Sequence, residues 1–412
     1  PQSVDANSTA EVAALAVNGQ IVASAGGQTV LNVGSQESGH WSGVLLNSGT
    51  IEVSALNFGA ANAYIGASGP TNVISSTIQV GSTLAKFGDG DVWLTGSNNI
   101  KGGGIRVSGG RLLISGSTEA TAVAVDSDAT LGIIGKAGVV QSPITLLTDG
   151  AKLLLGGGQA AEVDAKENSI ISGWGTIGTA KATNTVAGLI TAGPVPGELV
   201  FAGRTYLSDT AEFYWTLAGL HDDANPGTTP WNRLTFNNDL HMDHLQVYLN
   251  FTPETDPDSG NPFWQLPHTW TLWQFKVQPD WYFQEGNFDY SSGSFSITWN
   301  SNVSLAFLQF KPASPVAPTA SIRVAADKIT VTITYSGVLY ESDSLAGPWL
   351  PVEGANPSTY IVPTNLADLK FYRAYEAEPS SARSSRRPDG FRLNNRTRVL
   401  PYSGPQAPHL SE

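Results

Sequence analysis

Cysteine is absent from the 412-residue chain, and its absence excludes disulfide bonds, thiolate zinc sites and cysteine nucleophiles. Charge is also scarce, because Asp, Glu, Lys and Arg make up only 14% of the residues, against roughly 25% in an average domain. No apolar run approaches the roughly 18 residues of a membrane-spanning helix. The net charge of −13 disfavours nucleic acid and anionic membranes as partners. We therefore expect a monomer that neither spans a membrane nor binds nucleic acid.

Glycine and proline are abundant, with 44 and 24 residues, and they separate short runs of Val, Ile and Leu. This mixture is typical of short strands joined by tight turns. The length leaves room for two or three domains. The chain begins at Pro1, which indicates a processed start or a piece of a longer protein.

One short unit recurs in the first half of the chain: an apolar–polar–apolar run, a Gly/Ser/Asp turn and a second alternating run. It is clearest from Ile105 to Ile114, which reads IRVSGGRLLI. Further copies run from Val44 to Val53, Ile78 to Leu84, Val123 to Leu131 and Ile144 to Leu154. The starts at Ile78, Ile105, Val123 and Ile144 are separated by 27, 18 and 21 residues.

This spacing fits one coil of a β-solenoid, since strands of about 3–6 residues and their turns close a loop of about 20 residues. Alternation places the apolar side chains inside and the polar ones outside. A sandwich or meander is the competing account, but it does not require the same unit to return at this interval. The repeat therefore predicts an all-β chain with a parallel β-helix over residues 1–311.

The stretch from Lys86 to Gly116, KFGDGDVWLTGSNNIKGGGIRVSGGRLLISG, resembles the autotransporter-associated β-strand repeat. The matching residues are Gly88, Gly90, Leu94, Thr95, Gly96, Asn98, Asn99, Gly102, Gly103, Val107, Gly110, Leu112 and Leu113. The resemblance implies a right-handed parallel β-helix in a secreted or passenger protein at the surface of a Gram-negative-type bacterium. It also implies that the motif residues are turns and core, not an active site.

The alternation continues past Gly188, with expected strands near 199–201, 205–207, 234–240 and 245–251. We expect insertions at 219–232 and 253–268, and aromatic-rich final coils or a cap over about 200–311. Seven of the 11 tryptophans lie between Trp215 and Trp299. A carbohydrate-stacking surface is one interpretation, with Trp264, Trp270, Trp273, Trp281 and Tyr282 as binding residues, because flat rings match the apolar faces of sugars. A cap over the apolar end of the solenoid is the other, and we favour it.

The C-terminal part has a different composition. Residues 312–318, PASPVAP, are predicted to be a linker. Residues 319–376 contain, in order, Leu339-Tyr340-Glu341-Ser342, Gly347-Pro348-Trp349, Val352-Glu353-Gly354-Ala355 and Lys370-Phe371-Tyr372-Arg373. This order resembles a fibronectin-like module, which implies a small β-sandwich with Trp349 in its core and a role in attachment or spacing. Residues 377–412 hold six arginines among Ser and Pro, and we predict a disordered, solvated tail in preference to a site for an anionic polymer.

Motifs for chemistry are sparse. His241, Asp243 and His244 are the best metal candidates, with His221, Asp222 and Asp223 nearby, but on a strand His244 points away from the other two. Asp89-Gly90-Asp91 matches one calcium-binding nonapeptide, whereas such a site needs tandem copies. The sequence has no nucleophile elbow, phosphate-binding loop or dinucleotide fingerprint. We predict no catalytic residues, no metal and no cofactor.

These observations predict an extracellular or cell-surface structural protein of the adhesion type, a solenoid stalk that presents loops to an unknown surface or matrix partner. The alternative is a protein that binds polysaccharide or degrades it as a lyase or glycosidase. An open groove with a close carboxylate pair beside exposed tryptophans would favour the alternative. An apolar stack without a cleft would favour the first.

Overall fold

The computed structural model describes residues 2–4, 9–12, 14–23, 28–34, 38–100, 102–147, 149–191, 193, 196–223, 231–242, 245–276, 280–281, 287–300, 304–313, 320–324, 331–335, 338–342, 350–352, 359–362 and 371–375. They belong to two compact units, residues 1–256, 267–289 and 295–310 in one and residues 257–266, 290–294 and 311–412 in the other. The described helices are two short 3-10 turns, η1 (Pro257–Ser259) and η2 (Pro262–Gln265). Neither is long or apolar enough to cross a membrane.

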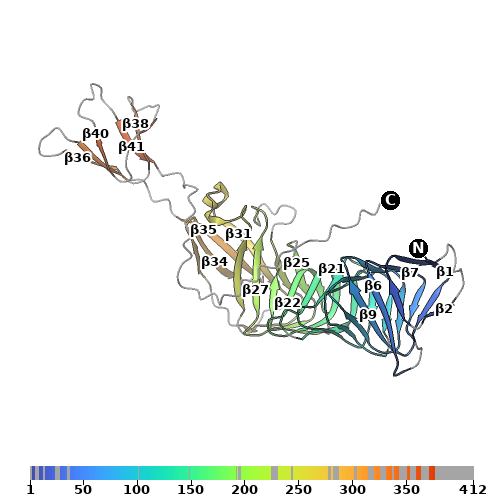
Figure 1. Ribbon diagram of the computed structural model, residues 1–412. Coiled ribbons are helices and arrows are strands. Elements are labelled where there is room, and N and C mark those ends of the chain that lie inside the picture. The colour runs from blue at the N-terminus through green and yellow to red at the C-terminus, as the bar shows by residue number, and fades with distance from the viewer. Residues whose placement is uncertain are drawn as a thin grey trace. The chain divides into compact units, whose positions relative to one another are not determined.

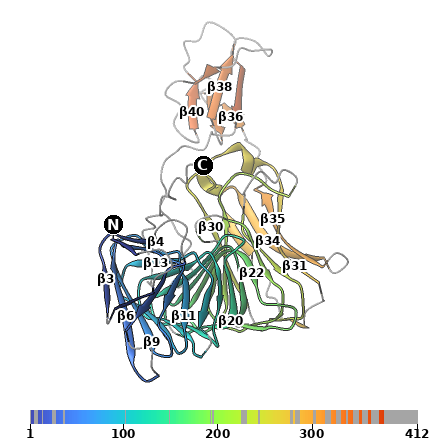
Figure 2. The ribbon, with the colours of Figure 1, turned by 90° about the vertical axis from the view of Figure 1, so that its right-hand side faces the viewer.

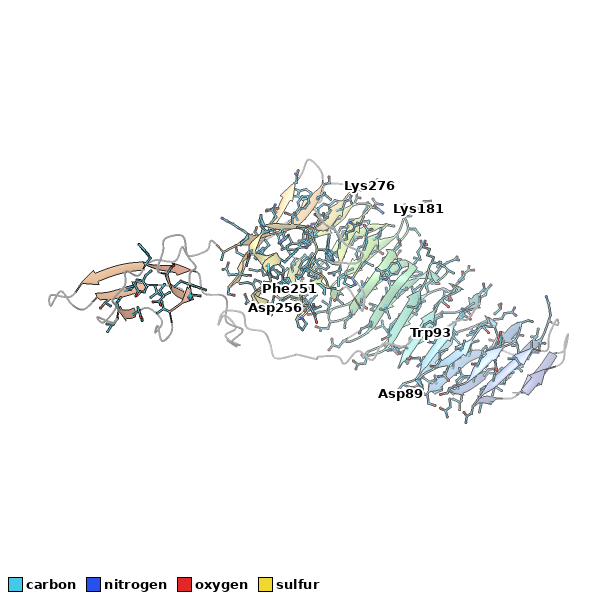
Figure 3. All side chains as sticks on the ribbon, turned by 90° about the horizontal axis from the view of Figure 1, so that it is seen from above. Asp89, Trp93, Lys181, Phe251, Asp256 and Lys276 are labelled. Atoms are coloured by element: carbon cyan, nitrogen blue, oxygen red, sulfur yellow. The ribbon has the colours of Figure 1, made fainter. Side chains whose placement is uncertain are left out.

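The first unit is a parallel β-solenoid with three strands in each coil (Figures 1 and 2). Most strands pair in parallel with the strand three places further along the chain, so like strands of successive coils form three stacks. Seen from above, the strands follow one another along the solenoid axis (Figure 3). The parallel pairing excludes a sandwich or meander for this half of the chain.

The three stacks share the long strands β20, β21 and β22, which pass from one stack to the next. The first stack contains β1 (Gln2–Val4), β4 (Gln20–Ala23), β7 (Thr50–Glu52), β10 (Asn72–Ile74), β13 (Asp91–Leu94), β16 (Arg111–Ile114), β19 (Thr130–Ile134), β21 (Lys152–Ala165), β22 (Ile170–Ile177), β24 (Leu189–Thr191), β27 (Glu212–Leu217) and β30 (Gln246–Phe251). The second contains β2 (Thr9–Val12), β5 (Val30–Val33), β8 (Ala55–Asn57), β11 (Thr77–Val80), β14 (Asn98–Ile100), β17 (Ser117–Glu119), β20 (Val139–Leu146), β21, β22, β25 (Glu198–Phe201), β28 (Arg233–Phe236) and β31 (His268–Phe275). The third contains β3 (Leu15–Val17), β6 (Trp41–Asn47), β9 (Asn62–Ser68), β12 (Leu84–Phe87), β15 (Ile105–Val107), β18 (Val123–Val125), β20, β21, β23 (Thr183–Val186), β26 (Arg204–Leu207), β29 (Leu240–Met242) and β32 (Asp280–Trp281).

Columns of side chains in register from coil to coil fill the interior. A column of the first stack consists of Ile51, Ile74, Leu94, Ile114 and Ile133, none of which has exposed surface. Burying one such side chain stabilises the fold by about 1.5–3 kcal/mol relative to leaving it in water. The columns therefore supply the cohesion of a chain that has no disulfide bond.

Glycines in the turns let successive coils approach closely. Gly110 has a φ of 55°, and a Cβ atom there would lie 2.6 Å from the carbonyl oxygen of Gly90 in the preceding coil. A side chain at Gly110 would therefore meet both backbone strain and a backbone clash. The glycine of the repeat motif is required by the stacking of the coils.

Antiparallel pairing replaces parallel stacking near the end of the first unit. The last parallel partners are Met242 and Trp281, whereas β31 pairs antiparallel with β35 (Leu305–Pro312). In the sequence, β33 (Asn287–Tyr290) and β34 (Gly293–Asn300) lie between these two strands. The prediction of parallel coils up to residue 311 is therefore wrong at its end, because β35 runs antiparallel along β31 and does not begin another coil.

The second unit contains two antiparallel sheets of three strands each. One consists of β36 (Ala320–Val324), β37 (Val331–Tyr335) and β40 (Thr359–Val362), and the other of β39 (Leu350–Pro351), β38 (Val338–Ser342) and β41 (Phe371–Tyr375). Ile333 and Leu339 form a buried centre to which both sheets contribute, and this agrees with a small β-sandwich. Trp349, linker residues 314–318 and the tail 377–412 lie outside the described residues.

The repeat predicted from the sequence is confirmed in most of its strands. Ile105, Val123 and Ile144 are direct partners in the third stack. Ile78, however, belongs to the second stack and pairs with Asn98. The interval of 27 residues between Ile78 and Ile105 was therefore measured between strands of two different stacks. The mistake has a physical cause, since all three strands of a coil carry the same apolar–polar–apolar pattern.

Candidate functional site

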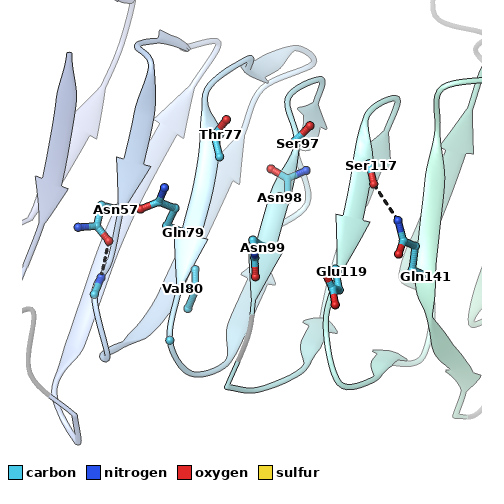
Figure 4. Close-up of a pocket in the computed structure, with 12 residues that line it drawn as sticks. Asn57, Thr77, Gln79, Val80, Ser97, Asn98, Asn99, Ser117, Glu119 and Gln141 are labelled. Atoms are coloured by element: carbon cyan, nitrogen blue, oxygen red, sulfur yellow. Dashed lines mark hydrogen bonds between the residues drawn. The ribbon is translucent and has the colours of Figure 1, made fainter. Parts of the chain in front are cut away.

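A polar groove of about 540 Å³ crosses β8, β11, β14, β17 and β20 on the outer face of the second stack (Figure 4). One row of its lining has a single amide or carboxylate side chain on each strand, namely Asn57, Gln79, Asn99, Glu119 and Gln141. A second row has the hydroxyl side chains Thr77, Ser97 and Ser117, each two positions before a member of the first row. We call these eight residues the polar groove.

The register of the strands aligns the first row. Asn57 is the partner of Gln79, Gln79 of Asn99, and Asn99 of Glu119. Strand alternation turns these side chains outward, as at Gln79, which lies between the buried residues Ile78 and Val80. Since neighbouring strands are about 4.8 Å apart, the row offers one polar group about every 4.8 Å along the solenoid axis.

The two ends of the row are held by hydrogen bonds. The Nδ2 of Asn57 donates to the Oδ1 of Asn32 at 2.8 Å, and the Oδ1 of Asn57 accepts from the backbone N–H of Gly59 at 2.9 Å. At the other end, the Nε2 of Gln141 donates to the Oγ of Ser117 at 3.2 Å. These contacts fix the amides at the borders of the groove before any ligand arrives.

The middle of the row has unused hydrogen-bonding capacity. The Oδ1 of Asn99 is buried and accepts no hydrogen bond from the described residues. A buried acceptor without a partner costs about 1–3 kcal/mol, so a rotation of the Asn99 amide that brings this oxygen to a donor on a ligand would be favourable. The outward-facing side chains of Gln79 and Glu119, on either side of Asn99, are exposed.

Lys86 is an unusual member of the interior. It occupies a column of the third stack between Ile65 and Val107 and has no exposed surface. Its Nζ donates to the carbonyl oxygens of Gly88 and Gly90, both at 2.6 Å, and of Gly109 at 2.7 Å. Burial lowers the pKa of Lys86 from 10.5 to about 8, although the nearby carboxylates of Asp91 and Asp89 act in the opposite direction.

A buried lysine with a lowered pKa resembles a catalytic amine, but its surroundings favour a structural role. The three carbonyl oxygens use all three N–H donors of the ammonium group. The neighbouring Asp91 is engaged by Arg111, whose Nε donates to Oδ1 at 2.7 Å and whose Nη2 donates to Oδ2. Lys86 therefore joins the turns of two successive coils through hydrogen bonds in the interior.

Glu212 is the described carboxyl group that most resembles a general acid, because burial raises its pKa. The nearby hydroxyl of Tyr248 lowers that pKa and partly offsets the effect of burial, and the same hydroxyl donates a hydrogen bond to Oε1 of Gln246 at 2.9 Å. The ring of Tyr248 lies 4.7 Å from that of Tyr214, centroid to centroid. Tyr248 is the one side chain that contributes to the pKa of Glu212, and no second carboxylate among the described residues does so.

The predicted aromatic site does not offer its rings to a ligand. Trp270 and Trp273 have no exposed surface, and Trp264 is 2% exposed. Trp270 packs edge-on against Trp215 with ring centroids 5.4 Å apart. A ring enclosed by protein cannot stack on a sugar, so the carbohydrate assignment is corrected for these three residues, which are core. The side chain of Trp281 and the whole of Tyr282 lie outside the described residues.

Exposed apolar side chains gather instead on the outer face of the third stack. Trp41, Leu45 and Phe87 are 74%, 55% and 40% exposed, and Trp41 lies 5.7 Å from Tyr64 between ring centroids. A Cβ atom at Gly66 would lie 2.6 Å from both Leu45 and Phe87, which close over this glycine. We call Trp41, Leu45, Tyr64 and Phe87 the outer patch.

Neither metal candidate forms a ligand cluster within the described residues, where no three His, Cys, Asp or Glu side chains converge. Asp222 instead pairs with His268, with 2.6 Å between Oδ2 and Nδ1. Asp223 accepts a hydrogen bond from the hydroxyl of Thr271 at 2.9 Å. Asp243 and His244 lie outside the described residues.

Sequence reasoning missed the polar groove. Its first row recurs at intervals of 22, 20, 20 and 22 residues, close to the coil length, so the signal was present. It was hidden because each member sits singly between apolar residues, as in Ile78-Gln79-Val80, and looks like ordinary outward polarity.

Comparison with known proteins adds no family. No protein-family model matches the chain, and no curated protein is similar to it in sequence. Any function inferred from the resemblance of residues 86–116 to the autotransporter-associated repeat is therefore a proposal.

Proposed function

We propose that the chain is a secreted or cell-surface scaffold, in which the solenoid is a rigid, non-catalytic support and the polar groove is the surface that contacts a partner. The observation that carries the proposal is the groove itself, in which five successive strands each add one outward amide or carboxylate to a continuous row. A row that follows the solenoid axis suits an extended partner better than a small substrate.

Two further observations support a scaffold. The buried Lys86 donates to backbone carbonyl oxygens of two coils, and the buried Asp91 accepts hydrogen bonds from Arg111 of the next coil. Both contacts hold coils together. The glycine turns of 86–116, which resemble the autotransporter-associated repeat, act in coil stacking. That resemblance also supports the surface of a Gram-negative-type bacterium as the location, and the sandwich module would serve attachment or spacing. The net charge of −13 supports a partner that is not nucleic acid.

Degradation of polysaccharide is the competing function, and the raised pKa of Glu212 is the observation in its favour. Glycosidases place a second carboxyl group about 5–9.5 Å from the first. The causes of the pKa shift of Glu212 are burial and Tyr248, and no carboxylate of the described residues is among them, which favours the scaffold.

Incubation of the full chain with a panel of neutral and anionic polysaccharides tests this choice. Reducing ends and unsaturated ends are measured over time, with Glu212→Gln as the comparison variant. The scaffold predicts no product above the protein-free blank for either protein. Product release by the wild type that Glu212→Gln lacks would establish the competing function.

A further inference from the structure

We propose that the polar groove binds a neutral linear polysaccharide, which lies along the solenoid axis across β8, β11, β14, β17 and β20. The proposal rests on the proposed function, since it names the partner of the same groove. It differs from the aromatic site expected from the sequence in its residues, its position and its chemistry.

The lining of the groove selects for neutral hydroxyl groups. Amides and hydroxyls both donate and accept hydrogen bonds, as sugar hydroxyls do. Among the described lining residues, Glu119 is the one charged side chain, and none is Lys or Arg. No cation among these residues compensates Glu119, so binding of an anionic polymer would be disfavoured.

The position of the groove disfavours a peptide. Peptides commonly join sheets by adding a strand at an exposed edge, where backbone N–H and C=O groups are free. The groove lies on the face of a sheet whose strands pair with a neighbour on each side, as β14 pairs with β11 and β17. Backbone groups there are already used, so recognition must come from side chains.

The geometry suits a chain of repeating units. The first row repeats about every 4.8 Å, so five members span roughly 19 Å along the axis. The hydroxyl row lies two residues away along each strand, a lateral distance of about 6.6 Å. A sugar ring between the rows can reach an amide on one edge and a hydroxyl on the other, and the next ring can repeat the contact.

The centre of the groove supplies the binding energy. The Oδ1 of Asn99 is buried and has no donor among the described residues. The flanking side chains of Gln79 and Glu119 are exposed, whereas Asn57 and Gln141 at the ends are held by other residues. If the Asn99 amide rotates toward the groove, a sugar hydroxyl can donate to this oxygen and satisfy a group that the described residues leave unpaired.

The same lining predicts binding without cleavage. Hydrolysis of a glycosidic bond uses two carboxyl groups in most enzymes, one as acid and the other as base or nucleophile. Glu119 is the one carboxylate among the lining residues that the structure describes. The polysaccharide is therefore held intact.

Affinity electrophoresis of the full chain tests the proposal in gels that contain β-glucan, xylan or mannan, with alginate and polygalacturonate as anionic polymers. We expect at least one neutral polymer to retard the wild type, and both anionic polymers to leave its mobility unchanged. The double variant Gln79→Ala/Asn99→Ala should raise the Kd about tenfold, as expected for the loss of two hydrogen bonds. Gln20→Ala, an exposed glutamine of the first stack, is the matched control and should keep wild-type retardation.

Three results would overturn the ligand assignment. One is the absence of retardation by every neutral polymer, another is equal retardation by the anionic ones, and the third is loss of retardation in Trp41→Ala but not in the groove variant. Far-ultraviolet circular dichroism and Tm establish that each variant is folded. The first two results leave the scaffold proposal intact, because that proposal is contradicted by product release and not by lack of binding. The third would leave the non-catalytic support intact but would move the contact surface from the polar groove to the outer patch.

Discussion

The ammonium group of Lys86 donates a hydrogen bond of 2.6 Å to the carbonyl oxygen of Gly90, inside a column of otherwise aliphatic side chains. The neighbouring residue Phe87 points outward and is 40% exposed. Strand alternation thus places a cation inside and an aromatic ring outside, against the usual hydrophobic order. The turn glycines provide the reason, because their carbonyl oxygens face inward and need donors.

Replacement of Lys86 by methionine should destabilise the solenoid. The variant keeps an unbranched side chain but leaves the carbonyl oxygens of Gly88, Gly90 and Gly109 without their shared donor. We expect the free energy of unfolding to fall by about 1–3 kcal/mol, measured by urea denaturation. Lys181→Met removes the same charge at an exposed position (Figure 3) and should have little effect. Equal stability of the two variants would contradict the bridging role.

The stability of the wild type should depend on pH through Lys86. Its pKa is lowered to about 8 in the folded chain, so the unfolded chain holds this proton more tightly. Between about pH 8 and pH 10.5 the unfolded state binds more protons, and a rise in pH therefore stabilises the folded state. The difference in unfolding free energy between the wild type and Lys86→Met should grow in favour of the wild type over this window. A constant or shrinking difference in urea titrations would refute the assignment.

Two glycine positions separate backbone strain from crowding. Gly110 and Gly135 have φ values of 55° and 72°, but only at Gly110 would a Cβ atom meet the preceding coil. Gly135→Ala should cost about 1–2 kcal/mol, the usual penalty of a left-handed residue. Gly110→Ala should cost more, because the carbonyl oxygen of Gly90 must also move. The Tm values of the two variants test this order. A smaller decrease in Tm for Gly110→Ala than for Gly135→Ala would contradict close stacking of the coils.

The sequence predicted the solenoid well where one pattern returned at coil length. Ile105–Val107 and Val123–Val125 were expected as strands and are β15 and β18, partners in register. The assignment of strands to stacks was not accessible, since Ile78 and Ile105 begin equivalent patterns on different faces. The antiparallel return of β35 along β31 was missed for a similar reason, because alternation says nothing of strand direction.

The candidate site was less accessible. The tryptophans near residue 270 drew attention because exposed rings bind sugars, but local sequence does not reveal that Trp270 and Trp273 are fully enclosed. The groove depends on the alignment of Gln79 with Asn99 and of Asn99 with Glu119. Each residue alone is an unremarkable outward polar group, and only the coil register makes them a row.

Thiol footprinting shows whether the polar groove holds a neutral polysaccharide. The chain has no cysteine, so Gln79→Cys and Glu52→Cys each carry a single reactive thiol at an exposed position, the first in the groove and the second on the first stack. The rate of reaction with a maleimide is measured with and without β-glucan, xylan or mannan. We predict that at least one polymer slows labelling of Gln79→Cys and leaves Glu52→Cys unchanged. Unchanged labelling of Gln79→Cys with all three polymers, or equal slowing at both positions, would contradict the claim.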